Sequence, residues 1–286
     1  MSPLGVNSLM TNLDRKERAL RARLASLGSS LVAYSGGTDS AFLAWAAHEV
    51  LGEHMLAVLA DSPSLPRHEL KLAVEFAERW QIPLNVIVTD EMSRPEYARN
   101  DSSRCFHCKD ELFTVMDEQR TKLGFRHVAY GKNLDDGGDF RPGQRAAEEH
   151  HVVAPLTEAA LGKEEIRSLA QRAGLIVWDK PASACLSSRI EYGRPVTREA
   201  LAAIEAGEEA LRELGFRQAR VRHHGEIVRI EIAREELDRA FSPEMAQQLV
   251  PIFKNLGFKY VTMDCEGYRS GSLNAVLPIE QIRMAG

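Results

Sequence analysis

The stretch LVAYSGGTDS, residues 31–40, constrains the fold of this chain most. Residues 30–34 have the length and composition of a buried strand, and residues 41–52 contain helix-forming residues and end at a glycine suited to cap a helix. Between them, Gly36 and Gly37 can adopt backbone angles closed to other residues. Because the first N–H groups of a helix have no partner within it, this strand, turn and helix predict an anion site.

The polar residues of this turn favour a nucleotide accompanied by a metal ion. The turn is not a Walker loop, which has four residues between its glycines and a lysine after them, because here the spacing is shorter and no lysine follows. Ser35, Thr38 and Ser40 add hydroxyl groups, and Asp39 adds a carboxylate that phosphate alone would not favour. Mg²⁺ bound with the phosphates would account for that carboxylate.

Strands and helices alternate over the first two thirds of the chain. Further strands are predicted at residues 55–61, 84–90, 127–131 and 151–156, with helical segments such as residues 67–81 between them. This alternation predicts a parallel sheet covered by helices on both faces. The polar stretches that follow the strands should therefore converge at the carboxyl edge of the sheet, where such folds bind their ligands.

The pattern changes at residues 190–197, a turn-rich stretch that indicates a linker. Beyond it we predict a helix, a hairpin, a second helix and a strand, at residues 198–214, 219–232, 235–256 and 259–264. The hairpin register is open, because its apolar residues do not all fit strict alternation. The predicted fold class is α/β, with a doubly wound parallel sheet in residues 1–190 and a second, smaller α+β domain in residues 191–286.

Composition sets the broad class of the protein. The 286 residues are 44% hydrophobic, which is enough for substantial cores. A net charge of −5 gives no overall attraction to nucleic acid or to an anionic membrane. The N-terminal stretch is rich in arginine and lacks an apolar signal core, so we expect neither export nor a membrane span, and a cytoplasmic location. In that compartment the four cysteines favour metal binding or catalysis over disulfides.

The cysteines and clustered acidic residues leave alternatives open. Cys105 and Cys108 have the CxxC spacing of a thiolate pair that binds one metal or cluster, or of a redox couple. Two thiolates do not complete a site, so a structural zinc site and buried free cysteines remain alternatives. Cys265 matches no role that we assign. Residues 135, 136 and 139 are aspartates that are either turn formers or functional groups.

Six segments together resemble a known family. SGGTDS resembles the PP-loop of ATP pyrophosphatases, which include NAD and GMP synthetases and several sulfur transferases. Residues 104–113, 131–147, 180–193 and 220–232, with residues 257–274, resemble the ATP-dependent sulfur transferases that mature the nickel-pincer cofactor of lactate racemase. The resemblance covers residues 29–274. It implies that the chain cleaves ATP to AMP and pyrophosphate and so adenylates a substrate.

The resemblance also implies a substrate and the residues that bind it. A carboxylated pyridinium mononucleotide would be adenylated, attacked by a sulfur donor and released as a thiocarboxylate. The implied pyrophosphate and Mg²⁺ site comprises Ser35, Gly36, Gly37, Asp39 and Ser40, with Gly131 beside the nucleotide. The implied phosphate site of the substrate comprises Ser188, Arg220, Arg222 and Arg269, with Lys109 and Glu208 also near the substrate. Independently of the resemblance, Arg220 and Arg222 are two apart on a predicted strand, so they share a face and could bind one phosphate together.

Cys185 falls where the family places a functional cysteine. In relatives that have all three cysteines, Cys105, Cys108 and Cys185 are implied to bind a [4Fe–4S] cluster whose open iron carries an extra sulfide. Relatives without the CxxC pair sacrifice the sulfur of one cysteine instead. We therefore predict a cluster and a catalytic set of Cys185, Lys109 and Asp39, with sulfur transfer from Cys185 itself as the alternative.

Other functions compete with this prediction. A PP-loop tRNA thiolase is the nearest, and the acidic pI and the lack of a recognisable RNA-binding module weigh against it. An amide-forming synthetase would need an added glutaminase domain, for which we expect the chain to be too short. A non-enzymatic nucleotide-binding module would release no pyrophosphate. The expected partner is a small nucleotide-like molecule. A homo-oligomer, a hexamer of two trimers, is implied by the resemblance alone.

Overall fold

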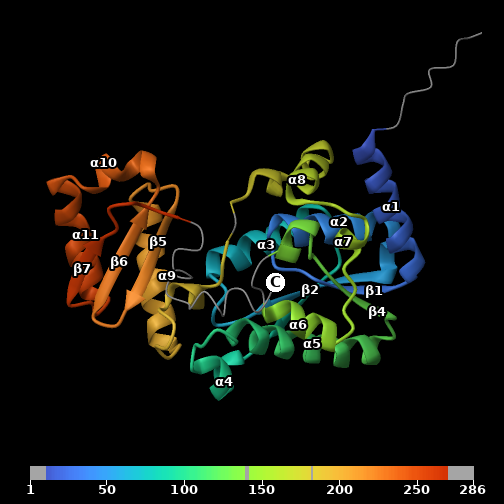
Figure 1. Ribbon diagram of the computed structural model, residues 1–286, viewed down its shortest axis with the longest axis horizontal. Helices are drawn as coiled ribbons and strands as arrows, with labels where there is room; N and C mark the ends of the chain where they lie inside the picture. The colour runs from blue at the N-terminus through green and yellow to red at the C-terminus, as the bar shows by residue number, and fades with distance from the viewer. Residues whose placement is uncertain (1–10, 139–141, 182, 270–286) are drawn as a thin grey trace, which may run out of the picture.

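The computed structural model describes residues 11–138, 142–181 and 183–269. They form two sheets, each with its own helices (Figure 1). The larger sheet lies in the blue to green part of the chain, and the smaller one lies in the orange to red part at the left of the picture. The two sheets are joined by the segment before α9, which crosses from one to the other.

The larger sheet is parallel throughout. Its strands are β1 (Ser30–Ala33), β2 (Met55–Asp61), β3 (Leu84–Val88) and β4 (His127–Tyr130), in the order β3-β2-β1-β4. Every residue of β1 is buried, as expected of a central strand covered on both faces. The prediction of an α/β fold with a parallel sheet is confirmed.

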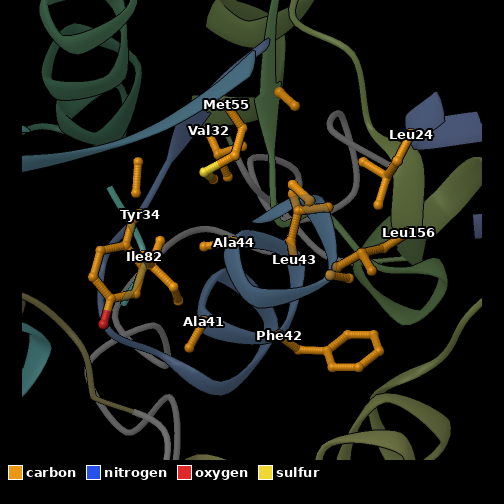
Figure 2. Close-up of a cluster of buried hydrophobic side chains, with 14 of the residues drawn as sticks. Leu24, Val32, Tyr34, Ala41, Phe42, Leu43, Ala44, Met55, Ile82 and Leu156 are labelled. Carbon is orange, nitrogen blue, oxygen red and sulfur yellow. The ribbon is translucent and has the colours of Figure 1, made fainter. Parts of the chain in front are cut away.

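Helices cover both faces of this sheet. One face carries α1 (Asn12–Leu27), α2 (Thr38–Leu51), α3 (Arg67–Arg79), α7 (Pro155–Glu158) and α8 (Lys163–Arg172). Figure 2 shows the core beneath them, where Val32 of β1 lies beside Met55 of β2; Phe42 and Leu43 of α2 and Leu156 of α7 belong to the same cluster. The opposite face carries α5 (Arg104–Leu123) and α6 (Pro142–Glu149), while the short α4 (Pro95–Ala98) precedes α5.

The smaller sheet has the order β5-β6-β7. Its elements are α9 (Arg198–Glu213), β5 (Ala219–His224), β6 (Ile227–Ile232), α10 (Leu237–Ala240), α11 (Pro243–Asn255) and β7 (Tyr260–Met263). The antiparallel hairpin pairs Val221 with Ile230, which places Val228 and Ile232 in the same core, whereas Ile227 falls on the other face and is 40% exposed. This settles the register that the sequence left open.

Short 3-10 helices lie between the main elements. They are η1 (Gly52–His54), η2 (Glu91–Ser93), η3 (Leu134–Gly138), η4 (Ile176–Asp179), η5 (Leu186–Arg189) and η6 (Arg234–Glu236). Tyr97 of α4 and Leu186 of η5 pack into the core of the smaller sheet. The division at residue 190 is thus crossed by side-chain contacts and stays a prediction. No helix in the described part of the chain is both long and apolar enough to cross a membrane.

Three predicted elements differ from the structure. The strand expected at residues 151–156 is wrong: Val153 makes only an isolated bridge to Ala129, and the proline at 155 begins α7. The helix expected at residues 235–256 is broken, because Ser242 caps α11 and Pro243 occupies its first turn, where proline is favoured. The helix α2 begins at Thr38 rather than at residue 41, so half of SGGTDS belongs to its first turn.

Candidate active site

The SGGTDS turn connects β1 to α2 in a conformation that requires glycine at one position. Gly36 has a φ of +72°, and a Cβ there would come within 2.7 Å of the Cβ of Ala73 on α3. Gly37 is the N-cap of α2 and supplies no side-chain cap. The turn is braced by Ser40, whose Oγ accepts from the backbone N–H of Ser35 at 3.2 Å and donates to the carbonyl of Gly37 at 3.0 Å. An uncapped helix N-terminus of this kind suits an anion.

The chain that follows β4 lies directly against this turn. A Cβ on Gly131 would come within 2.9 Å of the backbone nitrogen of Ser40 and within 3.2 Å of the carbonyl carbon of Asp39. Real side chains are not accommodated at such distances without a backbone shift. The structure therefore brings Gly131 into contact with the first turn of α2, where the resemblance places the nucleotide.

Asp39 is oriented by a residue that the sequence analysis did not identify. Asn133 donates from Nδ2 to Oδ2 of Asp39 at 2.9 Å, and its own backbone N–H donates to the carboxylate of Asp136 at 3.2 Å. Desolvation raises the pKa of Asp39; the bond from Asn133 opposes this shift and the charge of Asp136 adds to it. Such a carboxylate gains from a nearby cation, which fits the predicted Mg²⁺. Asp139, also considered from the sequence, lies outside the described residues.

Lys180 also binds the SGGTDS turn. Its Nζ donates to the carbonyl of Gly36 at 3.0 Å and forms an ion pair of 2.6 Å with Glu69 on α3. Just before it, the carbonyl of Val177 accepts from Thr38 Oγ1 at 2.8 Å. No sequence signal predicted these contacts, because a lysine 144 residues away from the glycine it binds carries no local pattern.

The three predicted sulfur ligands lie in one neighbourhood. Cys105 and Cys108 are in the first two turns of α5, and Cys185 directly precedes η5. The thiols of Cys105 and Cys108 each interact electrostatically with that of Cys185. Desolvation raises the pKa of the Cys108 thiol, with further contributions from Glu91 and Cys185. All are free, and over the described ranges no three His, Cys, Asp or Glu side chains are arranged to hold a metal ion, so the cluster stays a prediction.

Two further groups fix the loop that carries Cys185. The backbone N–H of Leu186 donates to the carbonyl of Ser64, in the turn after β2, at 2.8 Å. The Nη1 group of Arg189 donates to the carbonyl of Cys185 at 2.8 Å, and its guanidinium forms a buried ion pair of 2.9 Å with Glu208 on α9. Arg189 was also missed by the sequence analysis, whereas Glu208 was expected near the substrate and is engaged in this pair.

Lys109 projects from α5 beside the cysteines. Its ammonium interacts electrostatically with the thiols of Cys105 and Cys108, and it lies 5.6 Å from the centroid of the Phe113 ring. A Cβ on Gly143 would come within 2.9 Å of Lys109 Cγ, so α6 lies close against this side chain. Lys109 forms no ion pair with any described carboxylate, which leaves its charge available to a ligand.

The predicted phosphate-binding arginines lie on the polar face of the smaller sheet. The hairpin register places Arg220 and Arg222 opposite Glu231 and Arg229, all on the face turned away from the apolar core. Arg222 pairs with Glu231 at 2.7 Å and donates to the carbonyl of Ser188 at 3.2 Å, which links this face to the loop of Cys185.

The segment after β7 meets the same face and carries Tyr268 and Arg269. Arg269 pairs with Asp264 at 3.4 Å, and Asp264 lies 3.6 Å from Arg229. The guanidinium of Arg220 lies 5.2 Å from the ring centroid of Tyr268. The structure thus brings together Ser188, Glu208, Arg220, Arg222 and Arg269, although acidic side chains already pair with several of them.

Comparison with known proteins supports one family. No family model matches the chain. An uncharacterized protein of Synechocystis sp. is 42% identical over 265 residues, which are 93% of this chain and 99% of that protein. The pyridinium-3,5-bisthiocarboxylic acid mononucleotide synthase of Lactiplantibacillus plantarum is 34% identical over 276 residues, 96% of this chain and 99% of that protein. The glutamine-hydrolyzing GMP synthase of Heliobacterium modesticaldum is 26% identical over 191 residues, 59% of this chain but 36% of that protein.

Proposed function

The chain belongs to the family of the Lactiplantibacillus plantarum pyridinium-3,5-bisthiocarboxylic acid mononucleotide synthase, within the PP-loop ATP pyrophosphatases, and we propose that it makes the same class of product. It is an ATP-dependent sulfur transferase that acts on a pyridinium mononucleotide. The observation that carries this proposal is the similarity to that synthase, with 34% identity over 96% of the chain.

The first chemical step is adenylation of a substrate carboxylate. A carboxylate oxygen attacks the α-phosphorus of ATP, and pyrophosphate leaves with the electron pair of the broken P–O bond. The uncapped N-terminus of α2 suits the pyrophosphate, and Asp39 would hold the accompanying Mg²⁺. Adenylation turns a poor leaving group into AMP, and cationic groups stabilise the charge that accumulates at phosphorus.

The second step exchanges oxygen for sulfur. A sulfur nucleophile held near Cys185 attacks the carbonyl carbon of the acyl adenylate, the bond from carbon to the AMP oxygen breaks, and the thiocarboxylate is released. We assign Lys109 to the charge that develops on the carbonyl oxygen, because its ammonium lies beside the cysteines without an ion-pair partner in the described chain. The arginine-rich face next to Ser188 supplies the phosphate site of the substrate.

The cysteine site supports two sulfur sources. Three neighbouring thiols with cationic side chains around them suit anionic thiolate ligands, so Cys105, Cys108 and Cys185 would hold a [4Fe–4S] cluster that carries an extra sulfide when bound. In the alternative, the Cys185 thiolate displaces AMP to form a thioester, and loss of the Cα proton then breaks the Cβ–S bond, which releases the thiocarboxylate and leaves dehydroalanine at position 185. Iron content and the visible spectrum of anaerobically purified protein separate the two, as does the mass of the Cys185 peptide after turnover.

The decisive experiment supplies ATP, Mg²⁺, sodium sulfide and pyridinium-3,5-biscarboxylic acid mononucleotide to anaerobically purified protein. AMP and pyrophosphate are expected in equal amounts, and the substrate should gain mass for each oxygen replaced by sulfur. ADP as the main product would contradict the proposal. Sulfur incorporation into tRNA instead would support the competing tRNA thiolase. A homo-oligomer and a cytoplasmic location also belong to the proposal, and light scattering after size exclusion tests the first.

A further inference from the structure

Glu91 is a buried carboxylate without a cationic partner. Three acidic residues are buried in the described part of the chain, namely Glu91, Asp136 and Glu231. The second pairs with Lys163 at 3.3 Å, and the third pairs with Arg222 at 2.7 Å. Glu91 is only 1% exposed, yet it forms no ion pair with any described lysine, arginine or histidine. Because a buried charge without a cation is unfavourable unless hydrogen bonds compensate it, the hydrogen bonds of Glu91 indicate what its carboxylate stabilises.

Three hydroxyl groups from two strand ends donate to this carboxylate. Its Oε1 atom accepts from Ser64 Oγ at 2.6 Å and also from Ser62 Oγ, both in the turn after β2. Its Oε2 atom accepts from Oγ1 of Thr89, directly after β3, at 3.3 Å. Hydrogen bonds to an ionised acceptor are stronger than those between neutral groups. Glu91 therefore joins the ends of the neighbouring strands β2 and β3 at the carboxyl edge of the sheet.

The turn that Glu91 holds contacts the loop of Cys185. Within this turn, the backbone N–H of Ser64 donates to Oγ of Ser62 at 3.0 Å. The carbonyl of Ser64 accepts from the backbone N–H of Leu186 at 2.8 Å. Because Leu186 directly follows Cys185, this bond places the cysteine relative to β2, which neighbours the strand that leads into the SGGTDS turn. A contiguous path of hydrogen bonds thus runs from Glu91 to the peptide bond between Cys185 and Leu186.

We propose that Glu91 is a positioning residue for the sulfur-transfer step, because its carboxylate fixes the turn that holds the Cys185 loop in place. This inference rests on the proposed function. In that step a bond forms between sulfur and the carbonyl carbon of the acyl adenylate, and the bond from carbon to the AMP oxygen breaks, with its electron pair leaving on AMP. Glu91 neither gains nor loses a proton and acts through geometry, since a displacement of about 1 Å can slow such a step about 100-fold. Adenylation itself needs no sulfur, so it does not depend on this placement.

The first test compares thiocarboxylate formed with pyrophosphate released, in anaerobic reactions with ATP, Mg²⁺, sodium sulfide and the pyridinium mononucleotide. In Glu91→Ala this ratio should fall about tenfold or more relative to the wild type, because an adenylate that meets no well-placed sulfur is hydrolysed to the carboxylate and AMP. Pyrophosphate release should stay close to that of the wild type. A parallel loss of both products would show a merely structural role and overturn the proposal. A wild type that releases no pyrophosphate would instead contradict the proposed function.

The variant Glu91→Gln separates geometry from charge. The amide oxygen of glutamine can accept from the same serine hydroxyls and its NH₂ group can donate to Thr89, so Glu91→Gln should retain most of the wild-type ratio. If it loses the ratio as fully as Glu91→Ala does, the charge rather than the geometry is responsible and the proposal is overturned. The matched control is Glu111→Ala, which removes the acceptor of the Asp90 backbone N–H at 2.8 Å in the same loop. This control should leave the ratio unchanged, and an equal loss would also overturn the proposal.

A second test needs neither ATP nor substrate, so it stands or fails separately from the proposed function. Hydrogen exchange of the Leu186 amide, which donates to Ser64, is followed by mass spectrometry with single-residue fragmentation in the wild type, Glu91→Ala and Glu91→Gln. Exchange should accelerate about tenfold or more in Glu91→Ala alone, while the amides of the fully buried β1 keep their protection. Unchanged exchange at Leu186, or equal acceleration in β1, would overturn the proposal.

A further variant keeps the test available if Glu91→Ala does not fold. Ser64→Ala in the Glu91→Gln background removes one hydrogen bond to the turn without leaving a buried charge. It should lower the ratio of thiocarboxylate to pyrophosphate below that of Glu91→Gln and speed exchange at Leu186. If neither quantity changes, the turn does not position the Cys185 loop and the proposal is overturned.

Discussion

Lys180 donates from its ammonium to the carbonyl of Gly36 at 3.0 Å, which ties the segment before Cys185 to the turn predicted to bind ATP. The same ammonium pairs with Glu69 on α3 at 2.6 Å, and both side chains are largely buried. A few residues later, Leu186 donates to Ser64 after β2. Lys180 therefore contacts the nucleotide turn and Leu186 directly follows Cys185, so residues close together in the sequence serve both chemical steps.

Replacing Lys180 with Met should weaken ATP use. The turn loses a charge-assisted bond and Glu69 is left without its partner, so we expect about 1–3 kcal/mol less stability in urea unfolding and a KM for ATP raised about tenfold in a pyrophosphate-release assay. The matched control is Lys71→Met, which removes an exposed pair of 3.8 Å to Glu75 on the same helix and should change neither quantity. Equal effects of the two substitutions would show that Lys180 does not position the turn.

Asp39→Asn should stabilise the protein in the absence of Mg²⁺ and slow its reaction. Desolvation raises the pKa of Asp39 above that of an unfolded chain, so its stabilising effect is present below its ordinary pKa of 3.8 and is lost as the pH rises through the folded value. At pH 7 without Mg²⁺ the ionised carboxylate therefore disfavours the fold, and Asp39→Asn should raise the melting temperature while it slows adenylation by about 100-fold or more. The gain should shrink as the pH is lowered toward the ordinary pKa of 3.8. A melting temperature below that of the wild type at pH 7 would contradict this interpretation.

Two glycines of the site should respond differently to alanine. At Gly131 a Cβ would press on the backbone of Ser40, so Gly131→Ala should cost about 1–3 kcal/mol of unfolding free energy and reduce ATP turnover. At Gly37, where φ is −76° and the nearest atom is Ser35 Oγ at 3.6 Å, alanine should leave stability within about 0.5 kcal/mol. Urea denaturation and ATP binding by calorimetry measure both. If Gly37→Ala is the more destabilising change, the close approach of Gly131 is not what fixes the turn.

The sequence predicts the fold and part of the site because those features are local. Strand and helix periodicity predicts the order of β1, α2, β2 and β3. The two glycines of SGGTDS predict the turn between β1 and α2. The strand expected at residues 151–156 fails because its apolar run contains a proline that begins a helix, and periodicity alone does not weigh that. Residues such as Asn133, Lys180 and Arg189 escape prediction because their partners lie far away in the chain or are backbone atoms, and no spacing rule encodes such contacts.

The arginines of the smaller sheet should divide into a structural and a substrate-binding role. Arg222 pairs with the fully buried carboxylate of Glu231, with which Arg229 also pairs at 3.1 Å, so Arg222→Met removes one of two cationic partners of a buried charge and should cost about 1–3 kcal/mol of stability. Adding Glu231→Gln removes that charge and should restore a large part of the loss, as a double-mutant cycle in urea will show.

Arg220 lies over Tyr268 beside the same face. Arg220→Met should leave stability closer to that of the wild type but weaken binding of the phosphorylated pyridinium substrate by about 2–5 kcal/mol. Calorimetric titration with the mononucleotide and with its dephosphorylated nucleoside checks this assignment, because the penalty of Arg220→Met should disappear when the substrate has no phosphate. An equal penalty for both ligands would mean that Arg220 contacts another part of the substrate.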